Sequence, residues 1–159
     1  MHAVEAADSA LRDMIRDLRQ STIGPGGLAE TLRLLASQIE TATHIRVLTD
    51  LRPVSGSALT HLLTYQLARE ALSNAARHSN ATTIVIALDQ DEESIRLRVS
   101  DDGSGFNPLG VDSNLHFGLQ LMRERAELAG GLLLVDSNPG EGTTVLARLP
   151  IDEKTRPGP

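Results

Sequence analysis

The sequence predicts an α+β fold, a two-layer sandwich with helices on one face of a mixed, mostly antiparallel sheet. Helical periodicity and strand alternation occupy separate segments of the chain, which favours layered packing over a helical bundle. Segments 82–88 and 94–101 flank a short charged turn, and 132–137 and 143–150 flank "NPGEG". Two such hairpins are typical of antiparallel pairing.

The chain is expected to begin with a helix over residues 3–19, before "IGPGG" (23–27) breaks it. Its apolar residues form a narrow seam, typical either of a helix that packs on a partner helix or of an amphipathic helix on its own domain. The seam of this first helix comprises Val4, Ala7, Leu11, Met14 and Leu18.

A second helix is expected over 28–40, and "HIRVLTD" (44–50) is expected to be a strand.

A long helix is expected over residues 58–79, with Ser57 as its N-cap. A serine at this position can accept a hydrogen bond from a free N–H of the first turn. The apolar face of the helix comprises Leu59, Leu62, Leu63, Leu67, Ala71, Leu72 and Ala75.

The fourth helix is expected over 117–129, ended by Gly130 and Gly131. The Gly-, Asp- and Asn-rich segment 102–117 lacks periodicity and is expected to be a functional loop. Residues 151–159 are expected to form a disordered tail, so that 28–150 make up the folded domain.

Composition excludes several classes of protein. With 159 residues the chain suits one domain, and it has no Cys for disulfides or thiolate metal sites. A formal net charge of −6 and 2% aromatic residues argue against nucleic acid as a partner. The sequence shows no signal peptide and no apolar run long enough to cross a membrane, which predicts a cytoplasmic location for this portion.

Three polar residues recur four positions apart in the long helix. Glu70, Asn74 and His78 share one stripe, which Gln66 extends, and we expect it opposite the leucines. Carboxylate and amide oxygens suit a hard cation such as Mg²⁺. The alternative is an ordinary solvated helix face.

Further motifs follow downstream. In "DDGSGF", Asp101 precedes Gly103 and Gly105, so a carboxylate able to accept from an amine stands beside backbone that a ligand can approach closely. Gly118 would leave free N–H groups at a helix start, a site suited to phosphate. Thr143 begins the last strand after a tight turn. Each motif alone is equally compatible with a simple turn or helix start.

The order of the motifs is more specific. E-x-x-x-N-x-x-R-H, D-x-G-x-G, G-L-x-x-M and G-x-G-T, over residues 28–150, resemble the four boxes of the histidine-kinase ATP-binding domain. That domain belongs to the superfamily of gyrase, Hsp90, histidine kinases and MutL (GHKL) and implies its Bergerat ATP-binding fold. "SNLHFGLQLMRERA" further resembles the nitrate/nitrite sensor kinases.

The resemblance implies roles for individual residues. Asn74 would be the Mg²⁺ ligand, and Glu70 would orient a water near the metal and the γ-phosphate. Asp101 would receive the adenine amino group. The remaining nucleotide-binding positions implied are Arg77 and His78 near the phosphates, Gly103 and Gly105 shaping the pocket, Gly118 and Leu119 at the end of an ATP lid over 106–117, and Thr143 near adenine.

The resemblance also implies a partner domain. In such kinases a phosphoacceptor histidine lies on a dimerisation hairpin, and residues 1–22 resemble only the end of that hairpin's second helix. The chain is therefore expected to be a monomeric fragment of a homodimer, anchored upstream. It would bind Mg·ATP without phosphorylating itself, while the intact kinase passes phosphate to a response-regulator aspartate. The alternatives are an ATPase switch and an anti-sigma-type serine kinase.

Overall fold

The computed structural model describes residues 26–110 and 113–151, which form three helices and five strands. The predicted helix over 1–22 and the tail over 152–159 lie outside the described residues. In chain order the elements are α2 (Gly27–Thr43), β1 (Arg46–Leu51), α3 (Ala58–His78), β2 (Thr83–Gln90), β3 (Ser94–Asp101), α4 (Ser113–Leu128), β4 (Leu132–Ser137) and β5 (Thr143–Pro150).

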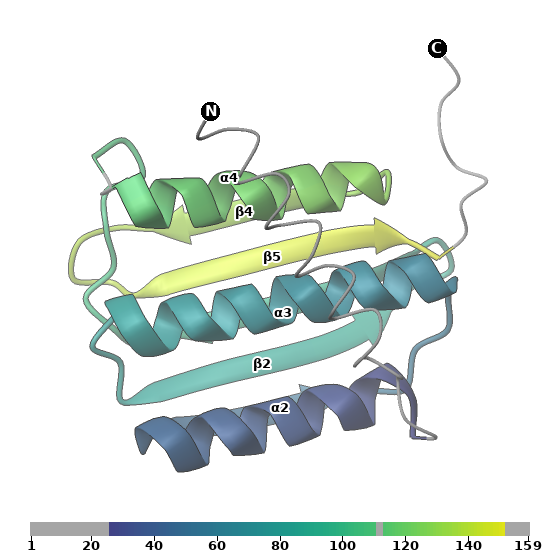
Figure 1. The fold of residues 1–159 in the computed structure, drawn as a ribbon, viewed down its shortest axis with the longest axis horizontal. Helices are drawn as coiled ribbons and strands as arrows, with labels where there is room; N and C mark the ends of the chain where they lie inside the picture. Colours follow the sequence, from purple (N-terminus) through teal and green to yellow (C-terminus); the bar gives the residue numbers. More distant parts are fainter. Residues whose placement is uncertain (1–25, 111–112, 152–159) are drawn as a thin grey trace, which may run out of the picture.

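The five strands form one mixed sheet in the order β1-β2-β3-β5-β4. Only β1 and β2 are parallel, and α3 is the crossover between them; the other pairs are antiparallel. All three helices lie side by side on one face of the sheet, with α3 in the middle (Figure 1). The predicted fold class is confirmed.

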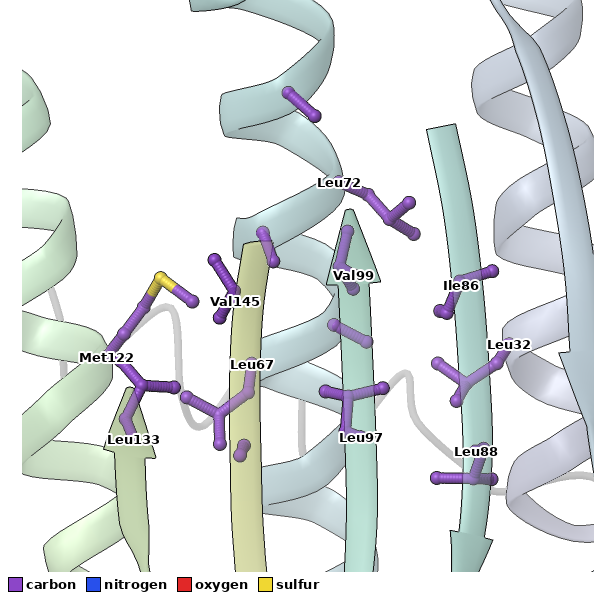
Figure 2. Close-up of a cluster of buried hydrophobic side chains, with 14 of the residues drawn as sticks. Leu32, Leu67, Leu72, Ile86, Leu88, Leu97, Val99, Met122, Leu133 and Val145 are labelled. Atoms are coloured by element: carbon purple, nitrogen blue, oxygen red, sulfur yellow. The ribbon is translucent and has the colours of Figure 1, made fainter. Parts of the chain in front are cut away.

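The core lies between the helices and the sheet. In Figure 2, Leu72 of α3 lies between Val99 of β3 and Ile86 of β2, and Leu67 of α3 lies over β5. Met122 of α4 lies near Leu133 of β4. Alternate residues of β2 and β3 are buried, as the period-two pattern predicted. Among residues 26–110 and 113–151 no helix covers the opposite face, so the strand residues between the buried ones are exposed or partly exposed.

The start of α3 confirms one prediction and corrects another. The Ser57 hydroxyl accepts a hydrogen bond from the Thr60 N–H at 3.1 Å, so Ser57 is the N-cap. Leu59 was expected on the apolar face but is 42% exposed. In the first turn the buried side is taken by Thr60, whose hydroxyl donates to the Pro150 carbonyl at 3.0 Å.

The start of α4 corrects a larger error. The helix begins at Ser113, four residues before the predicted start, so Gly118 lies inside it and the C-terminal part of the predicted lid is helical. The apolar spacing of Leu115, Leu119 and Met122 explains this, since all three are buried on the same side. Their packing outweighs the roughly 1 kcal/mol that an interior glycine costs a helix.

Candidate nucleotide-binding site

A cleft opens between α3, α4 and the adjoining ends of β3 and β5. About 440 Å³ of space not filled by protein atoms, part of it open to solvent, lies in this cleft. Its lining combines an apolar wall with a few polar groups. The lining residues are Ala71, Asn74, Ala75, His78, Ser79, Val99, Asp101, Gly105, Phe106, Leu115, Leu119, Thr143 and Val145.

Two residues of the polar stripe of α3, Glu70 and Asn74, face α4, whereas His78 at the end of the helix is exposed. A Cβ built on Gly118 would stand 3.0 Å from Glu70 Oε1 and 3.9 Å from Asn74 Nδ2, so both side chains point at the backbone of α4. The Asn74 amide also lies 4.0 Å from the Met122 sulfur. Gln66 is 2% exposed and neither of its amide atoms has a partner. The expectation of a stripe opposite the leucines was therefore wrong.

Asp101 ends β3 with its carboxylate at the cleft. Its Oδ1 accepts a hydrogen bond from the Gly103 N–H at 2.9 Å. Burial raises the pKa of this carboxyl above its ordinary value, and the N–H groups of Gly103 and Thr143 and the Ser79 hydroxyl oppose that effect. The group is thus a hydrogen-bond acceptor poised in a partly apolar pocket.

The carboxylate of the neighbouring Asp102 accepts hydrogen bonds at the start of β2 and does not line the cleft. Its carboxylate accepts from the Thr82 hydroxyl at 2.7 Å and from the N–H groups of Thr82 and Thr83 at 2.9 and 3.0 Å. The Thr82 hydroxyl and the Thr83 N–H lower its pKa. Asp102 therefore anchors the start of β2, and Asp101 is left to face the cleft.

Two glycines fix the loop after β3. A Cβ on Gly103 would stand 2.2 Å from the Ser79 carbonyl oxygen, so only glycine allows this approach to the end of α3. Gly105 has φ +62° and a Cβ there would stand 2.0 Å from the Asn138 carbonyl oxygen. The loop is thus held against both α3 and the β4–β5 turn.

Thr143 lies opposite Asp101 in the β3–β5 register. Its hydroxyl is 2.9 Å from the Ser137 hydroxyl, which also accepts from the Phe106 N–H at 2.9 Å. Ser137 is 5% exposed, so this network connects the start of the loop to β4 and β5 beneath the cleft.

The structure brings most of the predicted site residues together. Asn74, His78, Asp101, Gly105, Leu119 and Thr143 line the cleft. Glu70 and Gly118 contact each other beside it, and Gly103 packs against Ser79. Arg77 is exposed and does not line the cleft.

Several lining residues were missed by the sequence analysis. Val99 and Val145 lie two positions from Asp101 and Thr143 on the same strand face, so the period of two could have identified them. Ala71 and Ala75 were assigned to the core only. Ser79 and Leu115 gave no motif signal, because their place depends on how α3 and α4 pack.

The residues offer few metal ligands of their own. Within residues 26–110 and 113–151, no group of three or more His, Cys, Asp or Glu side chains could hold a metal ion. The Glu70 carboxylate and the Asn74 amide oxygen suit Mg²⁺, which commonly takes one or two protein ligands and completes its shell with phosphate oxygens and waters. The fit is therefore to a metal that arrives with a phosphate ligand. No helix among the described residues is long and apolar enough to span a bilayer.

Sequence comparisons identify related proteins. Residues 60–153 match the family "Histidine kinase-, DNA gyrase B-, and HSP90-like ATPase". Sensor histidine kinase LiaS of Bacillus subtilis is 32% identical over 152 residues, 94% of this chain and 41% of that protein. Sensor protein VraS of Staphylococcus haemolyticus is 29% identical over 155 residues, 95% of this chain and 43% of that protein. The chain thus spans less than half the length of these curated relatives.

Solved structures share the fold. The histidine kinase domain of the Erythrobacter litoralis EL346 blue-light activated histidine kinase aligns with a TM-score of 0.64 and 26% identity, covering 78% of this chain and 61% of that one. The ATP-binding domain of PrrB from Mycobacterium tuberculosis aligns with a TM-score of 0.59 and 22% identity, covering 77% of this chain and 92% of that one.

Proposed function

Because the chain belongs to the histidine kinase-, DNA gyrase B-, and HSP90-like ATPase family, we propose that the cleft between α3, α4 and the sheet is its ATP site and that it serves a sensor histidine kinase. The family implies ATP as the ligand. One observation carries the assignment to this cleft: Asn74, Asp101, Leu119 and Thr143 come from four separate sequence motifs and line the same cavity.

The base would bind at the Asp101 end of the cleft. An ionised carboxylate accepts from the 6-amino group of adenine and repels the carbonyl oxygen that guanine carries there. Thr143, directly across from Asp101, supplies a hydroxyl, and Gly105 lines the same end of the cleft. Val99 and Val145 provide the apolar surface on which a planar base packs.

The phosphates would lie toward Asn74 and α4. When bound, Mg²⁺ would neutralise charge on the phosphate oxygens, with Asn74 as its protein ligand. Glu70, whose carboxylate lies against Gly118, would accept a hydrogen bond from a water beside the phosphates. His78 at the rim and the exposed Arg77 would add a donor and a positive charge near the phosphates.

Calorimetry with a non-hydrolysable ATP analogue, with and without Mg²⁺, tests the site. The chain is expected to bind the analogue more tightly with Mg²⁺, and Asn74→Ala is expected to abolish most of that gain. Gln120→Ala is the matched control, because Gln120 is an exposed amide on α4 that donates to the Glu124 carboxylate at 3.2 Å and does not line the cleft. Equal Mg²⁺ dependence in Asn74→Ala and in the unmodified chain would contradict the metal assignment.

We further propose the reaction of a histidine kinase. The P–O bond to ADP breaks as a histidine nitrogen of a dimerisation domain forms the new P–N bond, and a response-regulator aspartate then takes the phosphoryl group. The chain's own residues bind and orient ATP for this transfer, which depends mainly on positioning and charge neutralisation. Support comes from the sensor histidine kinase relatives. His2 lacks the acidic neighbour of an acceptor box, so we expect the accepting histidine on the dimerisation domain and not at this position.

Labelled ATP tests the reaction. The chain alone is expected to yield no acid-labile phosphohistidine, whereas joining it to the phosphoacceptor hairpin of a relative such as LiaS is expected to yield it. Rapid ATP hydrolysis without transfer would favour an ATPase switch. Acid-stable label on the serine of an added protein would favour a serine kinase.

Three finer assignments complete the proposal. The resemblance of residues 113–126 to nitrate/nitrite sensor kinases suggests a response regulator of that type, testable by comparing transfer rates to several regulators. Residues 1–22 are proposed as the end of a dimerisation helix, with 28–150 as the catalytic domain. Sedimentation of the chain with and without residues 1–22 tests whether that segment associates, and we expect a monomer in both cases. We propose a cytoplasmic location for this portion, because ATP is available there.

A further inference from the structure

We propose that Ser137 is a positioning residue that fixes the hydroxyl proton of Thr143, so that Thr143 offers the cleft only acceptor lone pairs. The cleft then favours a base that carries an amino group over one that carries a carbonyl oxygen. This inference rests on the proposed function, since it assumes that the cleft binds a nucleotide base. Nothing in the motif pattern singled out Ser137, and its place is decided by the pairing of β4 with β5.

Ser137 lies behind the proposed base site. It ends β4, is 5% exposed and does not itself line the cleft. In the sheet register it pairs with Thr143 of β5, which in turn pairs with Asp101 of β3. Thr143 and Asp101 both line the cleft, so Ser137 can influence a ligand there through Thr143.

The Ser137 hydroxyl has three hydrogen-bond partners. The Phe106 N–H donates to its oxygen at 2.9 Å, and the hydroxyl donates to the Gly142 carbonyl oxygen at 3.0 Å. The Thr143 hydroxyl lies 2.9 Å from it. Because a serine hydroxyl has one proton and two lone pairs, these three partners use its whole capacity.

The direction of the bond to Thr143 follows from the other two. A backbone N–H can only donate and a carbonyl oxygen can only accept, so the single Ser137 proton is taken by Gly142. Thr143 must therefore donate its own proton to Ser137. What remains at the Thr143 oxygen is its free lone-pair capacity, which a ligand in the cleft can meet only with a donor.

This end of the cleft therefore combines two acceptors. Ionised Asp101 can only accept, and Thr143 is restricted to accepting by its bond to Ser137. The amino group of adenine has two N–H donors to offer them, whereas a carbonyl oxygen in that place offers none. For Thr143 to donate to such an oxygen, it would have to break its bond to Ser137, at a cost of about one net hydrogen bond.

The test compares two nucleotides on the full chain. Calorimetry measures the affinity for ATP and for inosine triphosphate, which carries a carbonyl oxygen in place of the amino group. Ser137→Ala releases the Thr143 proton, so the ratio of ATP affinity to inosine triphosphate affinity is expected to fall about two- to tenfold. Loss of the acceptor for the Phe106 N–H is expected to weaken both nucleotides alike, so a purely structural effect leaves this ratio unchanged.

A second background tests whether Thr143 carries the effect. Thr143→Val removes the hydroxyl at nearly constant shape, and adding Ser137→Ala to it is expected to leave the affinity ratio where Thr143→Val alone sets it. Ser137→Cys is measured in parallel in case Ser137→Ala unfolds. A thiol sulfur is a weak acceptor, so this variant is expected to lower the ratio in the same direction.

Ser94→Ala is the matched control. Ser94 is also a buried serine, 4% exposed, but it begins β3 whereas Asp101 ends it, and it does not line the cleft. Its hydroxyl accepts from Arg148 Nε at 2.6 Å. The affinity ratio of this variant is expected to equal that of the unmodified chain.

Four results would overturn the inference. An unchanged ratio in the Ser137 variants, or loss of folding in both of them, would leave Ser137 a structural role only. An equal fall of the ratio in the Thr143→Val background would exclude Thr143 as the carrier. Failure of the unmodified chain to bind ATP would overturn the proposed function as well, whereas normal ATP binding with any of the other results overturns this inference alone.

Discussion

Asp101 and Asp102 are adjacent in sequence and have opposite surroundings. Asp101 turns toward the cleft, where burial raises its pKa, whereas the Thr82 hydroxyl and the Thr83 N–H lower the pKa of Asp102. A raised carboxyl pKa means that the folded state favours the neutral form, so ionised Asp101 reduces stability at neutral pH. Asp102, with a lowered pKa, contributes stability above its unfolded pKa, and this is lost as pH falls through its folded pKa.

The two neutral variants should therefore separate function from stability. Asp101→Asn is expected to lower ATP affinity about ten- to a hundredfold, the range of a charged hydrogen bond, with a melting temperature equal to or above that of the unmodified chain. Asp102→Asn is expected to keep ATP affinity and to melt earlier at neutral pH. Calorimetry and thermal unfolding measure both. Unchanged ATP affinity in Asp101→Asn would contradict the adenine assignment.

ATP affinity should also depend on acidity. In the proposed site the ionised Asp101 is a stronger acceptor for the 6-amino group than the neutral carboxyl, so affinity is expected to be highest above its pKa and to fall as pH falls through it. Since burial raises that pKa, the loss is expected at a higher pH than for an ordinary aspartate. Titrating affinity against pH for ATP and for purine riboside triphosphate isolates this effect from phosphate ionisation, which the two nucleotides share. Parallel pH curves would exclude Asp101 as the cause.

At the scale of elements, the seam between α3 and α4 depends on Gly118. This glycine lies inside α4 and lets the Glu70 carboxylate approach the helix backbone. Glu70 and Asn74 thus lie at a helix–helix contact, which explains why two polar residues of α3 are only partly exposed. Glycine at this position lowers the intrinsic stability of α4 and keeps space for the polar stripe.

Gly118→Ala is expected to stabilise α4 and to impair the site. The helix gains up to about 1 kcal/mol from the propensity difference, while the new Cβ, 3.0 Å from Glu70 Oε1, displaces the carboxylate. Mg·ATP affinity is expected to fall severalfold at an unchanged or higher melting temperature. Gly110→Ala is the control, because a Cβ there meets nothing within 4 Å. Tighter Mg·ATP binding by Gly118→Ala would contradict a role for Glu70 beside the phosphates.

At the scale of the whole molecule, α3 joins the parts of the fold. It is the crossover between β1 and β2, contacts α2 and α4 on its two sides, and covers β3 and β5. Its residues therefore contribute to the core on one side and to the cleft on another. Loss of core packing under α3 should disturb stability first and ATP binding as a consequence.

Leu67→Ala is expected to destabilise the chain by about 2–5 kcal/mol, because Leu67 is fully buried at the centre of the core (Figure 2). Leu34→Ala, a change at a leucine that is 59% exposed, is expected to cost less than about 0.5 kcal/mol. Urea unfolding measures both. Similar losses in the two variants would mean that α3 is less central than the packing indicates.

The sequence by itself determined the fold class and most element boundaries, and it indicated the motifs of the proposed site. Period-two burial in β2 and β3 and the Ser57 cap are local features, and local spacing is enough to predict them. Motif order in the chain was enough to indicate an ATP-binding domain, and residues 60–153 match a family of ATPases.

Only the tertiary structure decided how those motifs meet. The facing of Glu70 and Asn74 toward α4, the burial of Gln66 and the convergence of Ser79 and Asp101 on Gly103 are contacts between elements distant in sequence. The early start of α4 has the same cause, since burial of Leu115 against the rest of the core outweighs the low helix propensity of Gly118. Side-chain periodicity shows which residues share a face, whereas packing decides what that face contacts.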